Sequence, residues 1–130
     1  MKVIDIPATE ITPKIILDKG NGIFLIQGKC LPEDVRSFYS PVIEWFDEYV
    51  EKPNDFTNIV LDFDYFNTAS SKMIIIILSK LRDLYRVGKQ VEVTWMFPKY
   101  DAELAEAGEE FSDLLSIPFN FVPKVEKPKS

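Results

Sequence analysis

Between residues 33 and 122, the hydrophobic pattern of this chain switches repeatedly between the period of a helix and the period of a strand. Stretches with apolar residues three and four positions apart predict helices over 33–51, 69–87 and 101–115. Runs of β-branched and aromatic residues predict strands over 57–66, 91–97 and 119–122. Because parallel strands need a crossover of a dozen or more residues, this alternation predicts a largely parallel sheet whose strands are connected by helices.

The first 30 residues predict antiparallel strands at one end of that sheet. Two short aliphatic runs, 14–18 and 22–28, are joined by Lys19, Gly20 and Asn21, residue types that suit a hairpin turn. A further short edge strand is predicted over 3–6. We therefore expect one α/β domain over residues 1–123, followed by a polar tail over 124–130. The domain should have a mixed sheet of five to six strands and three main helices, for which a shared face of the sheet is one arrangement open to them.

Two local features of these elements carry further expectations. Pro41 lies inside the first predicted helix, and because proline lacks a backbone N–H, it should kink the helix or divide it after Ser40. Strict alternation along the strand over 57–66 puts one set of side chains on one face, namely Ile59, Leu61, Phe63 and Tyr65. The same alternation puts the other set on the opposite face, namely Val60, Asp62, Asp64 and Phe66.

Composition excludes several classes of function. The net charge of −6 opposes nucleic-acid binding, and the absence of histidine removes histidine-based catalysis and His-ligated metal sites. Cys30 is the only cysteine, so no intrachain disulfide can form, and we expect a protein of the reducing cytoplasm. The longest apolar run, Met73 to Leu78, is too short to insert across a membrane, and no targeting segment is visible. No phosphate-cradling or dinucleotide motif is present, so we expect no cofactor.

Residues 62–72, with the sequence DFDYFNTASSK, form the most unusual segment, because a predicted strand ends there and a predicted helix begins. Asn67 or Thr68 suits the N-cap position, and Thr68, Ser70 and Ser71 bring three hydroxyl groups to the helix start. In one interpretation these side chains only cap the helix. In the other, the loop at the carboxyl end of the strand meets a ligand or partner, as such loops usually do in α/β sheets.

A hydroxyl in this segment is also a candidate for phosphorylation. A phosphoryl group adds about −1.5 to −2 charges at neutral pH, and the amides of a helix N-terminus favour an anion. The same charge is penalised when it is pressed into an apolar or acidic partner surface. Phosphorylation here is therefore expected to control docking while the fold is maintained, with Lys72 one turn along as a cation that could neutralise the phosphate.

Two other hypotheses remain open at this stage. Asp62 and Asp64 lie two apart on a strand and share a face, so they could serve a small-molecule-binding or enzymatic α/β domain. That hypothesis predicts a concave pocket beside both carboxylates. A purely structural subunit is the third hypothesis, and it predicts that Thr68→Asp and Thr68→Ala behave alike in every binding assay.

Motifs spread over nearly the whole chain resemble the SiaC family of bacterial regulatory phosphoproteins. The most specific is the stretch Tyr65-Phe66-Asn67-Thr68 followed by Ser70, Ser71 and Lys72. The remaining motifs are Thr12-Pro13, Gly28, Pro32-Glu33, Phe38-Tyr39, Pro41-Val42, Trp45, Trp95, Gly108-Glu109 and Ile117-Pro118-Phe119. The fold of that family is similar to the STAS domains of anti-sigma-factor antagonists, which agrees with the element order predicted above.

The resemblance implies a non-enzymatic adaptor that is switched by phosphorylation of Thr68. A SiaB-type protein kinase would add the phosphate, and a SiaA-type metal-dependent phosphatase would remove it. The unmodified protein would bind and activate a SiaD-type diguanylate cyclase, so that cyclic di-GMP signalling and biofilm formation follow the phosphorylation state. The expected docking surface surrounds Thr68 and comprises Asp64, Tyr65, Phe66, Asn67, Ser70, Ser71 and Lys72.

The chain departs from the family pattern at two positions near this segment. Cys30 and Ala69 stand where the family usually has serine. Both changes leave Thr68 in place, but either could alter the contacts with partners or the choice of acceptor hydroxyl.

Overall fold

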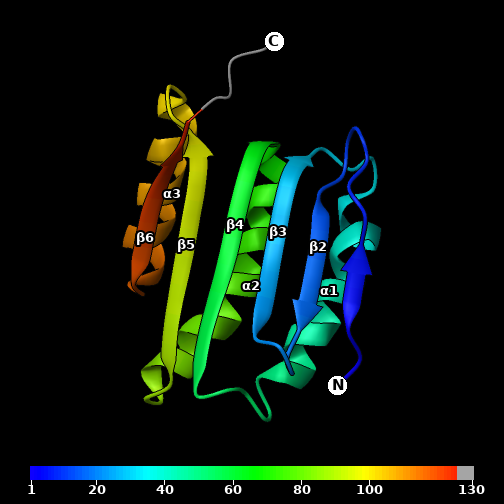
Figure 1. Ribbon diagram of the computed structural model, residues 1–130, viewed down its shortest axis with the longest axis vertical. Helices are drawn as coiled ribbons and strands as arrows, with labels where there is room; N and C mark the ends of the chain where they lie inside the picture. Colours follow the sequence, from blue (N-terminus) through cyan, green and yellow to red (C-terminus); the bar gives the residue numbers. More distant parts are fainter. Residues whose placement is uncertain (126–130) are drawn as a thin grey trace.

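The computed structural model describes residues 1–125, which form three helices and one six-stranded sheet (Figure 1). In chain order, the elements are β1 (Ile4–Ile6), β2 (Lys14–Asp18), β3 (Ile23–Cys30), α1 (Val35–Tyr49), β4 (Phe56–Phe66), α2 (Thr68–Arg86), β5 (Gln90–Pro98), α3 (Ala102–Leu115) and β6 (Phe119–Lys124). Every strand and helix predicted from the sequence is therefore present.

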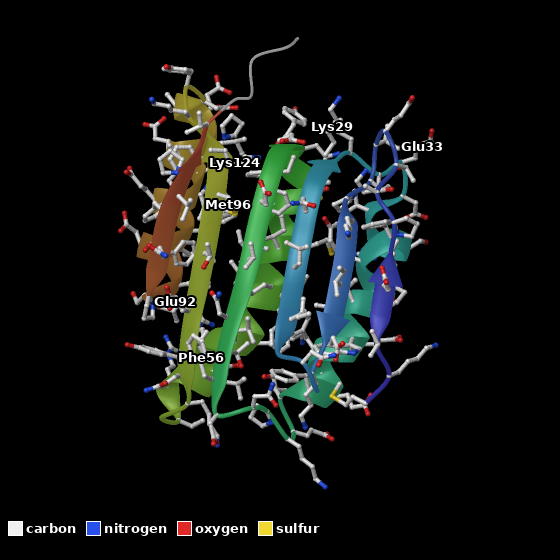
Figure 2. The ribbon with its side chains drawn as sticks, viewed as in Figure 1. Lys29, Glu33, Phe56, Glu92, Met96 and Lys124 are labelled. Carbon is white, nitrogen blue, oxygen red and sulfur yellow. The ribbon has the colours of Figure 1, made fainter. Side chains whose placement is uncertain are left out.

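The strands lie in the sheet in the order in which they occur in the chain. β1, β2 and β3 pair in antiparallel fashion, whereas β3, β4, β5 and β6 pair in parallel, as the helical crossovers predicted. All three helices lie on one face of the sheet (Figure 1). Figure 2 looks onto the opposite face, where no helix or strand of residues 1–125 covers the side chains.

The core lies between the sheet and the three helices and is rich in aromatic rings. Toward α1, the ring of Phe24 contacts those of Trp45 and Tyr49, with centroids 5.9 and 5.1 Å apart. Toward α3, Trp95 is fully buried and packs against Phe111 with a centroid distance of 5.4 Å. Edge-on and tilted aromatic packing of this kind adds to the free energy gained by burial, and it fixes the helices on the sheet.

The same kind of residue starts all three helices. Each N-cap side chain accepts a hydrogen bond from the amide three residues on, and so satisfies one of the free donors of the first turn. The three pairs are Asp34 with Ser37 at 3.1 Å, Asn67 with Ser70 at 2.8 Å, and Asp101 with Leu104 at 3.0 Å. Helix α2 therefore begins at Thr68, directly after its cap, and the structure resolves the choice between Asn67 and Thr68.

Helix α1 runs without interruption through Pro41, so the predicted division after Ser40 is wrong. Its buried face continues on both sides of the proline, with Tyr39, Val42 and Trp45 all facing the core. Packing of this amphipathic face outweighs the single hydrogen bond that Pro41 cannot donate.

A β-bulge near the end of β4 changes which side chains face the core. Gly28 pairs with Phe63, but the next residue of β3, Lys29, pairs with Tyr65, so Asp64 is an extra residue in β4. Gly28 has a φ of +118°, a conformation that suits glycine, and the register shifts directly after it. As a result Tyr65 is exposed, contrary to the predicted alternation.

Strand β6 extends to Lys124, so the predicted domain boundary after residue 123 falls inside this strand. Lys124, its last residue, is half-buried, and its amino group forms ion pairs with Asp62 and Asp64 of β4. Of the rest of the predicted tail, Val125 is exposed, and residues 126–130 lie outside the described residues.

Gly108 allows α3 to lie directly on the indole of Trp95. A Cβ atom built at Gly108 would lie 2.6 Å from ring atoms Cδ1 and Nε1 of Trp95, and that indole donates a 2.9 Å hydrogen bond to the Leu104 carbonyl.

We expect Gly108→Ala to lower the free energy of unfolding by about 2 kcal/mol, since overpacking outweighs the helix propensity of alanine. Urea unfolding measures this, with Gly20→Ala as the control, because its Cβ meets no atom closer than 3.7 Å. Equal stability of Gly108→Ala and the wild type would contradict the packing argument.

Candidate functional site

Thr68 is the first residue of α2 and lies at the carboxyl end of the central strand β4. The residue is exposed, and no hydrogen bond of its hydroxyl is found among residues 1–125. The sequence hypothesis required a hydroxyl that an enzyme can reach at the start of a helix. The structure places Thr68 in such a position.

The loop before Thr68 is fixed to the neighbouring strand β3 through a single carbonyl group. The backbone N–H of Asn67 donates to the carbonyl of Cys30 at 3.1 Å, and the hydroxyl of Ser70 donates to the same oxygen at 3.2 Å. Asn67 also caps the helix, so one residue determines both the loop path and the start of α2. The backbone around Thr68 is therefore held from two sides.

Ser70 was predicted as part of the docking surface, but the structure places it in the interior. Its exposed fraction is 0%, because its hydroxyl points to the Cys30 carbonyl beneath the loop. In this conformation Ser70 supports the loop and has no surface to offer a partner. The hydroxyl of Ser71 donates to the Thr68 carbonyl at 2.7 Å.

Cys30 and Tyr39 form a buried polar pair under the same loop. The Cys30 thiol contacts the Tyr39 hydroxyl, and both residues are fully buried. Burial raises the pKa of Cys30, against the opposing effect of hydrogen bonds to Tyr39 and Ser70. Burial also raises the pKa of Tyr39. Both groups are thus neutral at pH 7, and Cys30 acts as a small packing residue.

The other predicted docking residues differ in their access to solvent. Asp64, Tyr65 and Lys72 are exposed, whereas Asn67 and Ser71 are half-buried. Phe66 is also half-buried, and its ring packs against Trp95 with centroids 6.1 Å apart. Of the predicted docking residues, Asp64, Tyr65 and Lys72 therefore have exposed side chains, whereas Phe66 mainly anchors the end of β4 to the core.

Asp62 and Asp64 share a face, as predicted, but both carboxylates form ion pairs with Lys124 of the last strand, β6. The amino group of Lys124 lies 2.5 Å from Oδ1 of Asp62 and 3.1 Å from Oδ1 of Asp64. Gln27 donates a 2.9 Å hydrogen bond to the other oxygen of Asp62, whose side chain is only 10% exposed. Both carboxylates are therefore engaged in structural contacts, which favours a docking surface over the enzymatic alternative.

The pKa of Lys124 reflects these contacts. Burial alone would lower it, but hydrogen bonds and Coulombic attraction to Asp62 and Asp64 outweigh burial, so the pKa of Lys124 is raised. Sequence reasoning missed this residue because it was assigned to the tail. No local signal could have found it, because the apolar–polar alternation of the segment FNFVPK stops at Phe121, which Val122 and Pro123 follow.

Residues 1–125 lack two features that would indicate other classes of site. No group of three or more cysteine and carboxylate side chains is arranged to hold a metal ion. No helix in this part of the chain combines the length and apolar character that crossing a bilayer requires.

Comparison with protein families gives one match that spans nearly the whole chain. The protein-family model described as SiaC family regulatory phosphoprotein matches residues 6–124 of this chain. An uncharacterized protein of Pseudomonas aeruginosa strain UCBPP-PA14 is 30% identical over 119 residues, which cover 92% of this chain and 94% of that protein.

Solved structures of similar proteins agree with the fold described above. Apo-SiaC from Pseudomonas aeruginosa superposes with a TM-score of 0.84 at 31% identity, covering 94% of this chain and 99% of that one. A matching chain in the crystal structure of the diguanylate cyclase SiaD in complex with its activator SiaC, from the same organism, gives a TM-score of 0.87 at 29% identity. That match covers 93% of this chain and 99% of the other.

Proposed function

Because the chain belongs to the SiaC family of regulatory phosphoproteins, we propose that it is a non-enzymatic adaptor whose binding of a diguanylate cyclase is switched off by phosphorylation of Thr68. The unmodified form binds and activates the cyclase. A SiaB-type kinase and a SiaA-type metal-dependent phosphatase set the phosphorylation state. Cyclic di-GMP output and biofilm formation then follow that state in the cytoplasm, where the kinase finds ATP.

The observation that carries this proposal is the position of Thr68. An exposed hydroxyl stands at the first position of a 19-residue helix, on a loop held by Asn67 and by the Cys30 carbonyl. Its hydroxyl neighbours are less suitable acceptors, because Ser70 is buried and Ser71 donates to the Thr68 carbonyl. A kinase therefore meets one accessible hydroxyl on a well-supported backbone.

Electrostatics explains why a phosphate here leaves the fold intact. The free amides of the first turn of α2 and the helix dipole favour a nearby anion by about 0.3–1 kcal/mol. No acidic residue stands in that first turn to oppose the phosphate. A dianion in a protein interface, in contrast, costs desolvation and meets like charges, so binding changes far more than stability.

We infer the class of the partner from a relative of known structure. SiaC of Pseudomonas aeruginosa is described as the activator of the diguanylate cyclase SiaD, and this chain covers nearly all of that protein at 29% identity. The occupied carboxylates of Asp62 and Asp64 give no support to the alternative of an enzymatic or small-molecule site.

Phosphosite mapping tests the proposal. We expect incubation with a SiaB-type kinase and ATP to add one phosphate, which mass spectrometry locates on Thr68. Thr68→Ala should abolish the modification. Ser71→Ala should be modified like the wild type, because it keeps the acceptor Thr68. The hydroxyl of Ser71 is itself a poor acceptor, since the residue is half-buried and the hydroxyl donates a hydrogen bond to the Thr68 carbonyl. A phosphate located on another residue, or undiminished labelling of Thr68→Ala, would overturn the assignment of the acceptor.

A further inference from the structure

A basic hollow lies at the opposite end of α2 from Thr68, at the edge of the sheet where the parallel strand β5 begins. The C-terminal ends of α2 and α3 lie together at this edge (Figure 1). The hollow, here called the α2–α3 hollow, has a volume of about 540 Å³, within the range of about 300–1,000 Å³ typical of small-molecule sites. Its lining includes Arg82, Tyr85, Arg86, Lys89, Gln90 and Ser116.

The charged side chains that line the α2–α3 hollow all have the same sign. Arg82, Arg86 and Lys89 are cations, and none of the lining residues is acidic. Arg86 is exposed and forms no ion pair with any residue in 1–125. Lys89 pairs at 3.4 Å with the fully exposed Asp55, and such pairs contribute little. On a chain whose net charge is −6, this cluster favours an anionic ligand.

Cations at the end of a helix often serve its dipole, but the end of α2 is already capped by its own backbone. The N–H groups of Val87 and Lys89 donate to the carbonyl of Leu84 at 3.2 and 3.1 Å, and that of Gly88 donates to the carbonyl of Tyr85 at 3.1 Å. Gly88 has a φ of +96°, the left-handed conformation that such a cap uses. The charged side chains of the hollow are therefore not required as caps.

The guanidinium group of Arg82 carries a donor that no residue in 1–125 satisfies. Its Nε atom is buried and has no hydrogen-bond partner in this part of the chain. The carboxylate oxygen Oδ1 of Asp83 lies 4.0 Å from it, which is too far for a hydrogen bond. Buried donors without a partner are rare in native proteins. This donor is therefore an independent indication that the α2–α3 hollow receives a hydrogen-bond acceptor.

The α2–α3 hollow also offers a surface for a planar base. Tyr85 is 41% exposed and follows Arg82 by three positions, so the two side chains are neighbours on α2. Aromatic rings stack on bases, and guanidinium groups bind phosphate as well as the O6 and N7 atoms of guanine. Gln90 and Ser116 add neutral hydrogen-bonding groups to the lining. This combination fits a nucleotide better than it fits an inorganic anion.

We propose that the α2–α3 hollow binds a guanine nucleotide, with its phosphate on the three cations and its base on Tyr85. The choice of guanine rests on the proposed function, because a diguanylate cyclase consumes GTP and forms cyclic di-GMP, which share this base and a phosphate. Thr68 lies about 21 Å from Arg82 along α2 at the helical rise. The nucleotide therefore does not compete with a partner at Thr68, and the adaptor senses the substrate or the product of the cyclase at a separate site.

Isothermal titration of the unmodified protein with cyclic di-GMP, and separately with GTP, tests this inference. Saturable binding of either nucleotide at one site per chain supports it, and the tighter of the two identifies the ligand as product or substrate. Arg86→Gln should weaken binding at least tenfold, with the loss shrinking at high salt, and Tyr85→Ala should weaken it at least fivefold.

Matched controls lie at the opposite edge of the sheet. Arg36→Gln removes an exposed arginine from the first turn of α1, and Tyr100→Ala removes a tyrosine that is 82% exposed just after β5. Both variants should bind the nucleotide within twofold of the wild type. Circular dichroism verifies that all four variants are folded at the temperature of the titration.

The inference is overturned if neither guanine nucleotide binds, or if Arg86→Gln and Tyr85→Ala bind like the wild type. It is also overturned if ATP or inorganic phosphate binds as tightly as the guanine nucleotide. These titrations use this protein alone, so their failure leaves the switch at Thr68 standing. If phosphorylation of Thr68 instead has no effect on a cyclase, the proposed function fails, whereas the titrations still decide whether the α2–α3 hollow binds the nucleotide.

Discussion

Thr68→Asp should lower the affinity of this protein for the proposed partner, a diguanylate cyclase, about 100-fold and abolish activation at concentrations at which the wild type activates fully. The new carboxylate carries about half the charge of a phosphate and stands at the exposed first position of α2. A like charge across an interface costs several kcal/mol, and 100-fold corresponds to about 2.7 kcal/mol. Isothermal titration and the rate of cyclic di-GMP formation measure the two effects.

Two controls separate this effect from a loss of folding. Aspartate at the first position of a helix is favourable by about 0.3–1 kcal/mol, so the variant should be at least as stable as the wild type. Asn120→Asp adds the same charge at an exposed position of β6 and should bind normally. Binding of Thr68→Asp with the affinity of Thr68→Ala would instead support a purely structural role for this residue.

Lys124→Met should lower the free energy of unfolding by about 2–3 kcal/mol, the largest stability effect that we expect from one surface-facing side chain. The substitution keeps most of the aliphatic stem but removes the charge that faces Asp62 and Asp64. Asp62 is then left nearly buried, with only the amide of Gln27 as a partner for its carboxylate. Urea unfolding monitored by tryptophan fluorescence measures the loss.

A double-mutant cycle identifies the cause of that loss. Replacing Asp62 with asparagine removes the buried charge, so Lys124→Met combined with Asp62→Asn should recover most of the stability that Lys124→Met loses alone. Lys89→Met is the matched control, because Lys89 pairs only with the fully exposed Asp55 at 3.4 Å, and such pairs contribute little. A loss below about 0.5 kcal/mol for Lys124→Met would show that the contact with Asp62 is unimportant.

Most of the fold could be predicted because local signals agree with the tertiary structure. The helical spacing of α2 and the alternation of β5 each specify an element, and the short connections specify parallel crossovers. The failures have physical causes. Strict alternation cannot anticipate the bulge at Asp64, which depends on pairing with Gly28 in another strand. Likewise, the propensity of Pro41 to break a helix is overridden by packing of Tyr39, Val42 and Trp45.

The sequence predicts a hydroxyl-rich helix start as the candidate site, but it does not predict the contacts that hold the residues of that site in place. The chain order places a hydroxyl-rich segment at the end of a strand, and residue types identify a cap. Which hydroxyl faces solvent depends on the three-dimensional contact between Ser70 and the Cys30 carbonyl, two groups 40 residues apart. The pairing of Lys124 with Asp62 spans an even greater separation and carries no local signal.

The central claim is that a phosphate on Thr68 controls partner binding, and the most direct measurement compares the unmodified with the phosphorylated protein. The wild type is phosphorylated by the proposed SiaB-type kinase, verified by mass as singly modified on Thr68, and titrated against the proposed cyclase beside the unmodified protein. We predict that the phosphorylated form binds at least 100-fold more weakly and that phosphatase treatment restores full affinity. Equal affinities of the two forms would contradict the account.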